Sequence, residues 1–127
     1  MSNQPNKCDN TPRFEPQDQF LRRITHLWLK GPGKVSSAAF QNEKGKDRMS
    51  VNWLKLSSVD HTLSGHPGYG VASITAALCY SLEQQPVYSP AVDNAAHCDI
   101  VGHKTQGISR RFRDGAQYLC YPDAQLS

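Results

Sequence analysis

Polar and apolar residues alternate over several short stretches of the chain, as expected for strands that bury one face. In the stretch from 97 to 103, His97 and Asp99 would point to one side of the strand and Cys98 to the other. The side that carries His97 is polar enough to be either a site or a solvated face. Further strands are expected at 49–56, 70–74 and 87–88, with a short strand or a turn and strand at 35–40.

Two stretches have the period of amphipathic helices instead. The first covers 75–85, where Thr75 is the expected cap. The second follows a glycine-containing turn, with Thr105 or Ser109 as its cap. The apolar face of this second helix is expected to consist of Ile108, Phe112, Ala116 and Leu119.

Residues 18–29 fit both patterns. Phe20, Ile24 and Trp28 lie at helical spacing and also on one side of a possible strand. Their β-branched and aromatic character favours the strand, and the Gly-Pro-Gly sequence at 31–33 ends the element in either case. Residues 57–70 are expected to form a long connection.

This order of elements predicts the α+β class: a single compact domain with a mixed β-sheet and two or three helices. A chain of 127 residues is long enough to bury one core. Residues 1–16 are polar, contain three prolines and show no periodicity, so they are expected to form an extended or disordered arm. The domain itself is expected to span 17–127.

Charge is distributed unevenly along the chain. Residues 20–60 hold eight Lys or Arg against three Asp or Glu, a balance of +5, whereas the whole chain carries +3. The rest therefore carries −2, and the basic segment suits an anionic partner. The chain lacks a signal-peptide pattern, an apolar run of membrane-spanning length and a C-x-x-C pair, so a cytoplasmic protein with reduced thiols and no membrane contact is expected.

The candidate ligand-binding residues are basic or hydroxyl-bearing residues near the expected strand ends and the second helix: Arg22, Arg23, Ser36, Ser37, His97, Lys104, Arg110 and Arg111. A helix start followed by arginines attracts anions, because free N–H groups and guanidinium forks both bind phosphate. The alternative is that these arginines form only a solvated basic face.

Metal and cofactor binding are not expected. His97 and Asp99 would form a workable ligand pair on a strand, but His103 lies about 20 Å farther along an extended chain. The cysteines and histidines lack the paired spacing of a zinc site. We therefore expect no tightly bound zinc, and no sequence motif indicates a cofactor.

Short motifs spread over residues 20–116 resemble a group of small bacterial proteins of unassigned function. They are Leu21-Arg22-Arg23-Ile24, Val35-Ser36-Ser37-Ala38-Ala39-Phe40, Ser50-Val51 and Ala96-His97-x-x-Ile100-x-Gly102-x-Lys104. The resemblance implies one compact bacterial domain and carries no activity.

The chain also resembles ADP-ribosyltransferases, which place an arginine or histidine on a first strand and serines on a later one. Arg22, Arg23 or His26 would match the first role, and Ser36 or Ser37 the second. The catalytic glutamate of that family has no clear counterpart: Glu83 falls in an expected helix and Glu43 in a lysine-rich loop.

Together these observations favour a small soluble binding module for a protein partner or an anionic, phosphate-bearing ligand, with nucleic acid among the possible partners. The alternative is a small enzyme acting on nucleotides or nucleic acid, such as a toxin: an ADP-ribosyltransferase-like protein or a metal-independent nuclease. In a nuclease, His97 or His103 would move the proton, and Lys104 and Arg110 would stabilise the charge. An enzyme should bring Arg22 or Arg23, a serine of the pair at 36–37, and His97 into one pocket.

Overall fold

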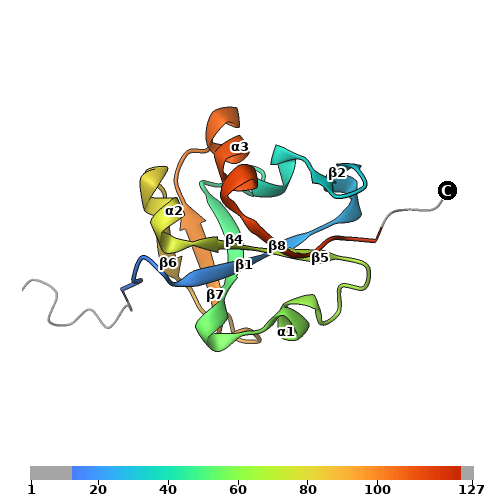
Figure 1. Ribbon diagram of the computed structural model, residues 1–127. Coiled ribbons are helices and arrows are strands. Elements are labelled where there is room, and N and C mark those ends of the chain that lie inside the picture. Colours follow the sequence, from blue (N-terminus) through green and yellow to red (C-terminus); the bar gives the residue numbers. More distant parts are fainter. Residues whose placement is uncertain (1–12, 124–127) are drawn as a thin grey trace, which may run out of the picture.

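A computed structural model describes residues 13–123 of the chain. Its main sheet has the strand order β6-β7-β4-β1-β5-β8 (Figure 1). The bounds are β1 Gln19–Ile24, β4 Arg48–Trp53, β5 Gly70–Thr75, β6 Gln85–Tyr88, β7 His97–Val101 and β8 Gln117–Cys120. Every neighbouring pair in this sheet is antiparallel. A separate small hairpin joins β2 Leu29–Gly31 to β3 Lys34–Val35.

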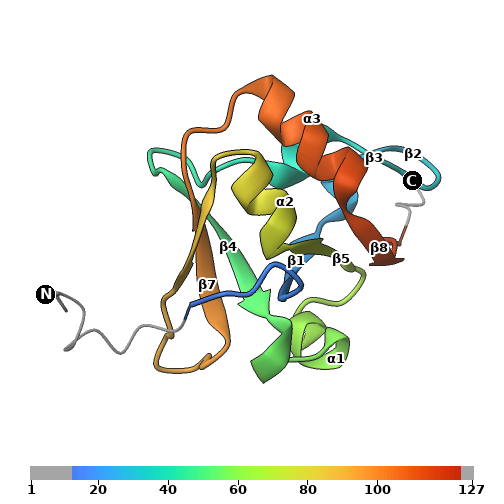
Figure 2. The same cartoon turned by 60° about the vertical axis from the view of Figure 1, so that its left-hand side comes forward.

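Within residues 13–123, three α-helices accompany the sheet: α1 Val59–Leu63, α2 Ala76–Ser81 and α3 Gln106–Gly115. Helices α2 and α3 lie on one side of the sheet and α1 on the other (Figures 1 and 2). Short 3₁₀ turns follow three strands: η1 His26–Trp28, η2 Ser37–Phe40 and η3 Leu54–Leu56. The α+β class, the single compact domain and the number of helices are as predicted. None of the helices within 13–123 is long and apolar enough to cross a membrane.

The core lies between the sheet and the pair α2 and α3. On the sheet side the core is formed by alternate strand residues: Phe20, Ile24, Met49, Val51, Trp53, Ile74, Cys98 and Ile100. From above, Phe112 of α3 stacks on Phe40 of η2 at 6.2 Å between ring centroids. The buried hydroxyl of Ser109 donates to the Phe40 carbonyl at 2.7 Å. Each fully buried aromatic ring contributes roughly 1.5–3 kcal/mol, so this contact anchors α3 to the sheet.

The helix starts agree with the sequence prediction. The Thr75 hydroxyl caps α2 by accepting from the Leu78 amide, and Thr105 caps α3 by accepting from Ile108, both at 3.1 Å. The strand–helix–strand unit β5-α2-β6 also exists. Because the strands alternate in direction, β5 and β6 run parallel, but β1, β4 and β7 lie between them. Helix α2 therefore crosses the sheet instead of joining neighbouring strands.

The turn between β7 and α3 depends on glycine at 102. Its φ of +145° lies in the region that side chains rarely adopt, and an added Cβ would lie 2.7 Å from the Gln84 side-chain oxygen. The Gln84 amide donates to the His103 carbonyl at 2.9 Å. This contact fixes the turn against the end of α2, and it leaves no room for a side chain at Gly102.

Four sequence predictions are corrected. Residues 37–40 form a 3₁₀ turn and not a strand, because the Ser36 hydroxyl accepts from the Ala38 amide and caps it. The strand expected at 49–56 ends at the buried Trp53, and the chain continues as η3. The connection at 57–70 contains α1, capped by Ser58. Leu119 belongs to β8 and is exposed, because pairing with β5 takes over after Gly115.

The expected arm at 1–16 falls within the described residues only from position 13. Phe14 is 8% exposed and makes edge contacts with Phe20 and Trp53, at 5.0 and 4.9 Å between ring centroids. The Pro16 carbonyl accepts from the Ala77 amide at the start of α2. The packed domain therefore includes Phe14, ahead of the boundary expected at residue 17.

Candidate functional site

The sheet splits between β1 and β4. The ladder pairs Phe20 with Trp53 and Leu21 with Asn52, and its next step would pair Arg22 with Val51 and Arg23 with Ser50. Those later pairs do not form, although β1 stays paired with β5 as far as Ile24 and β4 with β7 as far as Arg48. The split leaves a crevice of about 60 Å³, lined by Leu21, Arg22, Arg23, Ser50, Val51, Asn52, Thr62, Asn94 and His97.

Arg22 closes the split on the core side. Its Nη1 donates to the Ser50 carbonyl at 2.8 Å, and its Nε donates to the Ala39 carbonyl at 2.9 Å. The guanidinium also lies 5.4 Å from the centre of the Trp28 ring. Burial, aided by the charge of Arg23, lowers the pKa of Arg22 to about 10. Arg22 therefore replaces the missing ladder bonds and holds η2, which is a structural role.

Arg23 points to the opposite face. Its Nη1 donates to the Thr62 carbonyl of α1 at 3.0 Å, and the side chain is half-buried. Thr62 is fully buried, and its hydroxyl accepts from the Asn52 side chain at 3.1 Å. Asn94, in the loop before β7, donates to the other end of the Asn52 amide at 2.8 Å. Asn52 thus joins α1 and this loop at the mouth of the crevice.

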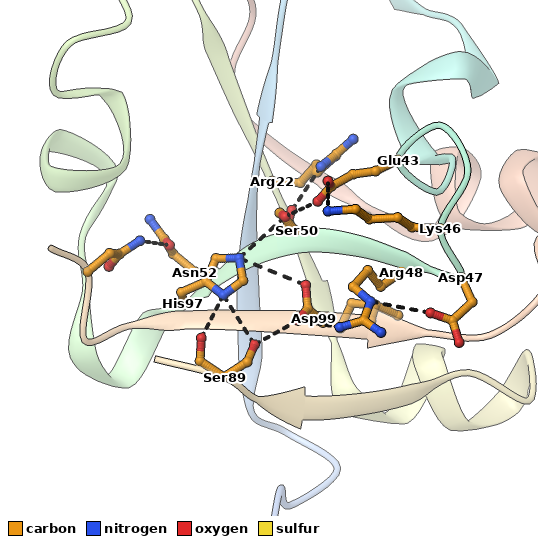
Figure 3. Close-up of polar contacts among 12 residues, drawn as sticks. Arg22, Glu43, Lys46, Asp47, Arg48, Ser50, Asn52, Ser89, His97 and Asp99 are labelled. Atoms are coloured by element: carbon orange, nitrogen blue, oxygen red, sulfur yellow. Dashed lines mark hydrogen bonds and ion pairs between the residues drawn. The ribbon is translucent and has the colours of Figure 1, made fainter. Parts of the chain in front are cut away.

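His97 enters the crevice from β7 with a fixed ring (Figure 3). Its Nδ1 lies 2.8 Å from the Ser89 carbonyl and 3.1 Å from the Ser89 hydroxyl. A carbonyl only accepts, so Nδ1 carries a hydrogen and the neutral ring presents the Nε2 lone pair. That Nε2 lies 3.3 Å from Ser50 Oγ and 3.8 Å from a carboxylate oxygen of Asp99.

The carboxylates of Glu43 and Asp99 lie beside residues that line the crevice, and each has a basic neighbour (Figure 3). Glu43 accepts from the Ser50 hydroxyl at 2.7 Å, and this hydrogen bond is the main cause that lowers the pKa of Glu43. Lys46 lies 3.5 Å from the other Glu43 oxygen. The buried Asp99 accepts from the Ser89 hydroxyl at 2.8 Å and lies 3.9 Å from Arg48.

A wider depression of about 380 Å³ continues from the crevice towards α1. It shares four residues with the crevice: Arg23, Asn52, Asn94 and His97. Its remaining lining includes His61, Ser64, His66 and Asp93. The combined surface offers hydrogen-bond donors and imidazole rings, with one exposed carboxylate at the rim.

Of the candidates predicted from the sequence, only Arg22, Arg23 and His97 are brought together at the crevice. Ser36 is used as the cap of η2, and Ser37 is the first residue of that turn. Neither serine lines the crevice, so the combination expected of an enzyme does not form with them. The crevice contains Ser50 instead, which was not among the candidates.

The basic residues after β7 lie elsewhere. Lys104 folds back on its own turn, where its ammonium donates to the carbonyls of Ile100 and Gly102 and to Asn42. Burial lowers the pKa of Lys104 to about 8. Arg110 and Arg111 are exposed on α3. Neither arginine lines the crevice, and the anion site expected at the start of this helix stays a prediction.

Sequence reasoning missed most of the polar residues in and beside the crevice: Glu43, Ser50, Asn52, Ser89 and Asn94. A signal for two of the β4 residues was present, because Ser50 and Asn52 alternate with the buried Met49, Val51 and Trp53. Glu43 was set aside as a loop residue, yet its loop brings it to Ser50.

Across residues 13–123, no group of three or more histidine, cysteine, aspartate or glutamate side chains is arranged to hold a metal ion. No protein-family model matches the chain, and no curated protein or solved structure shows significant similarity to it.

Proposed function

We propose that this protein binds a small anionic group, such as a phosphate, in the crevice between β1 and β4. The observation that carries the proposal is the presence of Arg23 and His97 in one polar crevice that the split sheet opens. A guanidinium has five N–H donors, and the Thr62 carbonyl takes one from Arg23. The remaining donors suit the oxygens of a phosphate or carboxylate.

The local charges support an anion and not a cation. Glu43 has Lys46 beside it and Asp99 has Arg48, so neither carboxylate faces the crevice without a basic neighbour. Because the guanidinium of Arg22 is bonded to two carbonyls, Arg23 is the arginine left to meet a ligand. The crevice has a volume of about 60 Å³, roughly twice the volume of one water in the liquid, so it admits only a small group such as a single phosphate. The wider depression would hold the rest of the ligand.

The test is a titration of isotope-labelled protein with inorganic phosphate, followed by amide NMR shifts. In wild type we expect saturable shifts at Arg23, Asn52 and His97. The Arg23→Gln variant should weaken binding at least tenfold, since a hydrogen bond to a charged group contributes roughly 1.5–3 kcal/mol. Arg23→Lys keeps the charge without the planar fork and should lose less.

A matched control changes Arg110 and Arg111 of α3 to glutamine together. These arginines are exposed and distant from the crevice lining, so phosphate binding should stay at the wild-type level. Equal phosphate binding by wild type and Arg23→Gln would refute the crevice as the binding site. Loss of phosphate binding in the α3 variant would place the site on that helix. If wild type binds no phosphate, a protein partner becomes the better hypothesis. Bacterial origin and cytoplasmic location remain predictions from the sequence.

A further inference from the structure

We propose that Ser50 is a nucleophile activated by His97, and that the crevice hydrolyses phosphate esters. This inference rests on the proposed function, because the anion site would hold the phosphoryl group next to the serine. It extends that function from binding to a reaction, and it assigns the attacking atom to Ser50 Oγ.

The geometry of the pair is that of a nucleophile beside a general base. Ser50 Oγ lies 3.3 Å from His97 Nε2, and the Ser89 carbonyl fixes the hydrogen of the ring on Nδ1. The Nε2 lone pair therefore faces the hydroxyl and can take its proton. A base that is itself oriented by a third group is the arrangement expected of an activated serine.

Asp99 stabilises the ring once it has accepted the proton. Its carboxylate lies 3.8 Å from His97 Nε2, and the hydroxyl of Ser89 holds its other oxygen at 2.8 Å. Because Asp99 is buried, its attraction for an imidazolium is screened less by water than that of a surface carboxylate. Ser89 thus contacts both partners, the ring and the carboxylate.

Glu43 competes for the same hydroxyl proton. The Ser50 hydroxyl donates to Glu43 at 2.7 Å, which is shorter than its distance to His97. A hydroxyl has one hydrogen, and rotation about its Cβ–Oγ bond moves that hydrogen from Glu43 to His97. The Glu43 side chain is 43% exposed, so this acceptor can turn away towards solvent and Lys46.

The reaction has two steps. In the first, a bond forms between Ser50 Oγ and phosphorus while the bond from phosphorus to the leaving oxygen breaks. The serine proton passes to His97 Nε2 and then to the departing alcohol. In the second step water attacks phosphorus, its proton passes through Nε2 back to Ser50, and the Oγ–phosphorus bond breaks. Arg23 would balance the charge on the phosphoryl oxygens in both steps.

A second serine–histidine contact in the chain provides an internal control. Ser57 Oγ lies 2.7 Å from His61 Nδ1, closer than Ser50 lies to His97. However, Ser57 also contacts the Ser58 carbonyl and the Thr62 hydroxyl, and His61 is exposed. Distance alone would favour Ser57, whereas an oriented base beside an anion site favours Ser50.

The test uses a fluorophosphonate probe on the full chain, with tryptic peptides analysed by mass spectrometry. Labelling forms the Ser50 Oγ–phosphorus bond, breaks the phosphorus–fluorine bond, and transfers the serine proton to His97. Trypsin releases residues 49–55, in which Ser50 is the only hydroxyl-bearing side chain, whereas Ser57 falls in the next peptide. We expect the label on 49–55, absent in Ser50→Ala and slowed at least about 100-fold in His97→Gln. The Ser57→Ala variant should label like wild type, since Ser57 lines neither the crevice nor the wider depression.

The possible results separate this inference from the proposed function. If wild type binds inorganic phosphate but 49–55 stays unlabelled, the nucleophile is refuted and the anion site stands. If 49–55 is labelled but phosphate does not bind, Ser50 stands as the nucleophile and the anion site is refuted. Label on the Ser57 peptide alone, or an unchanged rate in folded His97→Gln, overturns the assignment of Ser50 and His97. Amide NMR spectra of each variant establish that it is folded.

Discussion

The two faces of the sheet are used differently, although the same strands form both. On the face beneath α2 and α3, β4 and β7 contribute apolar side chains that bury one continuous core. On the other face the alternate residues of these strands, including Ser50 and His97, form a polar network beside α1. Each strand thus supplies packing from one set of residues and hydrogen-bonding groups from the other.

Adjacent residues show the contrast most directly. Cys98 points into the core, and burial raises the pKa of its thiol to about 12, so it is protonated and inert at neutral pH. Its neighbour His97 points into the crevice. The sequence prediction that these two side chains face opposite ways is confirmed. The core face should therefore respond to mutation through stability, and the polar face through binding and titration.

The largest effect is expected from Phe112→Ala, because this ring is fully buried against Phe40. Truncation of a buried phenylalanine costs about 3–5 kcal/mol of unfolding free energy. On the polar face, Ser50→Ala should cost only about 0.5–1.5 kcal/mol, the net contribution of a hydrogen bond. Urea unfolding of both variants measures the difference. Equal losses of unfolding free energy would mean that the polar face contributes as much to stability as the core face.

A smaller loss is expected at the N-terminal edge of the core. Phe14→Ala should cost about 3 kcal/mol, because the ring packs against Phe20 and Trp53. Phe14→Leu keeps most of the apolar volume and should cost less than about 1.5 kcal/mol. Thermal unfolding monitored by circular dichroism provides the comparison. If Phe14→Ala melts like wild type, the segment before β1 adds nothing to the core.

The two arginines of β1 point to opposite faces, and their replacement should cost different amounts of stability. Arg22→Met leaves the Ala39 and Ser50 carbonyls without their donor, and a loss of about 2–3 kcal/mol is expected. Arg23→Met removes one hydrogen bond to Thr62 and should cost about 1 kcal/mol. Denaturant midpoints at a common slope measure both. A larger loss at Arg23 would reverse the assignment of Arg22 as the structural arginine.

The smallest expected effect is a change in the pKa of Glu43. The pKa of Glu43 is lowered first by the Ser50 hydrogen bond and further by the charge and the hydrogen bond of Lys46, so Ser50→Ala should raise it. Because the folded pKa is the lower one, Glu43 adds stability above its unfolded pKa that disappears as pH falls through the folded value. Carbon-13 NMR of the side-chain carboxyl follows the titration. A Glu43 pKa that stays unchanged in Ser50→Ala would contradict the hydrogen bond as the main cause.

Local patterns were sufficient for much of the fold. Local patterns predicted strands within 70–74 and 97–103, which form as Gly70–Thr75 and His97–Val101, and the hydroxyls of Thr75 and Thr105 cap the helices as expected. Those predictions depend only on neighbouring residues, whose spacing is read directly from the chain. For the same reason, His97 and Asp99 were correctly placed on one face of their strand.

The amino-acid sequence by itself determined the α+β class, the helix caps and which strand residues share a face. Tertiary structure alone decided that β1 and β4 separate after Leu21, which opens the crevice. It also decided that Arg22 replaces the lost ladder and that Ser50, rather than Ser36, meets His97. These contacts join residues far apart in the chain, where the geometry is set by packing and strand pairing. The spacing of residues along the chain therefore does not predict these contacts.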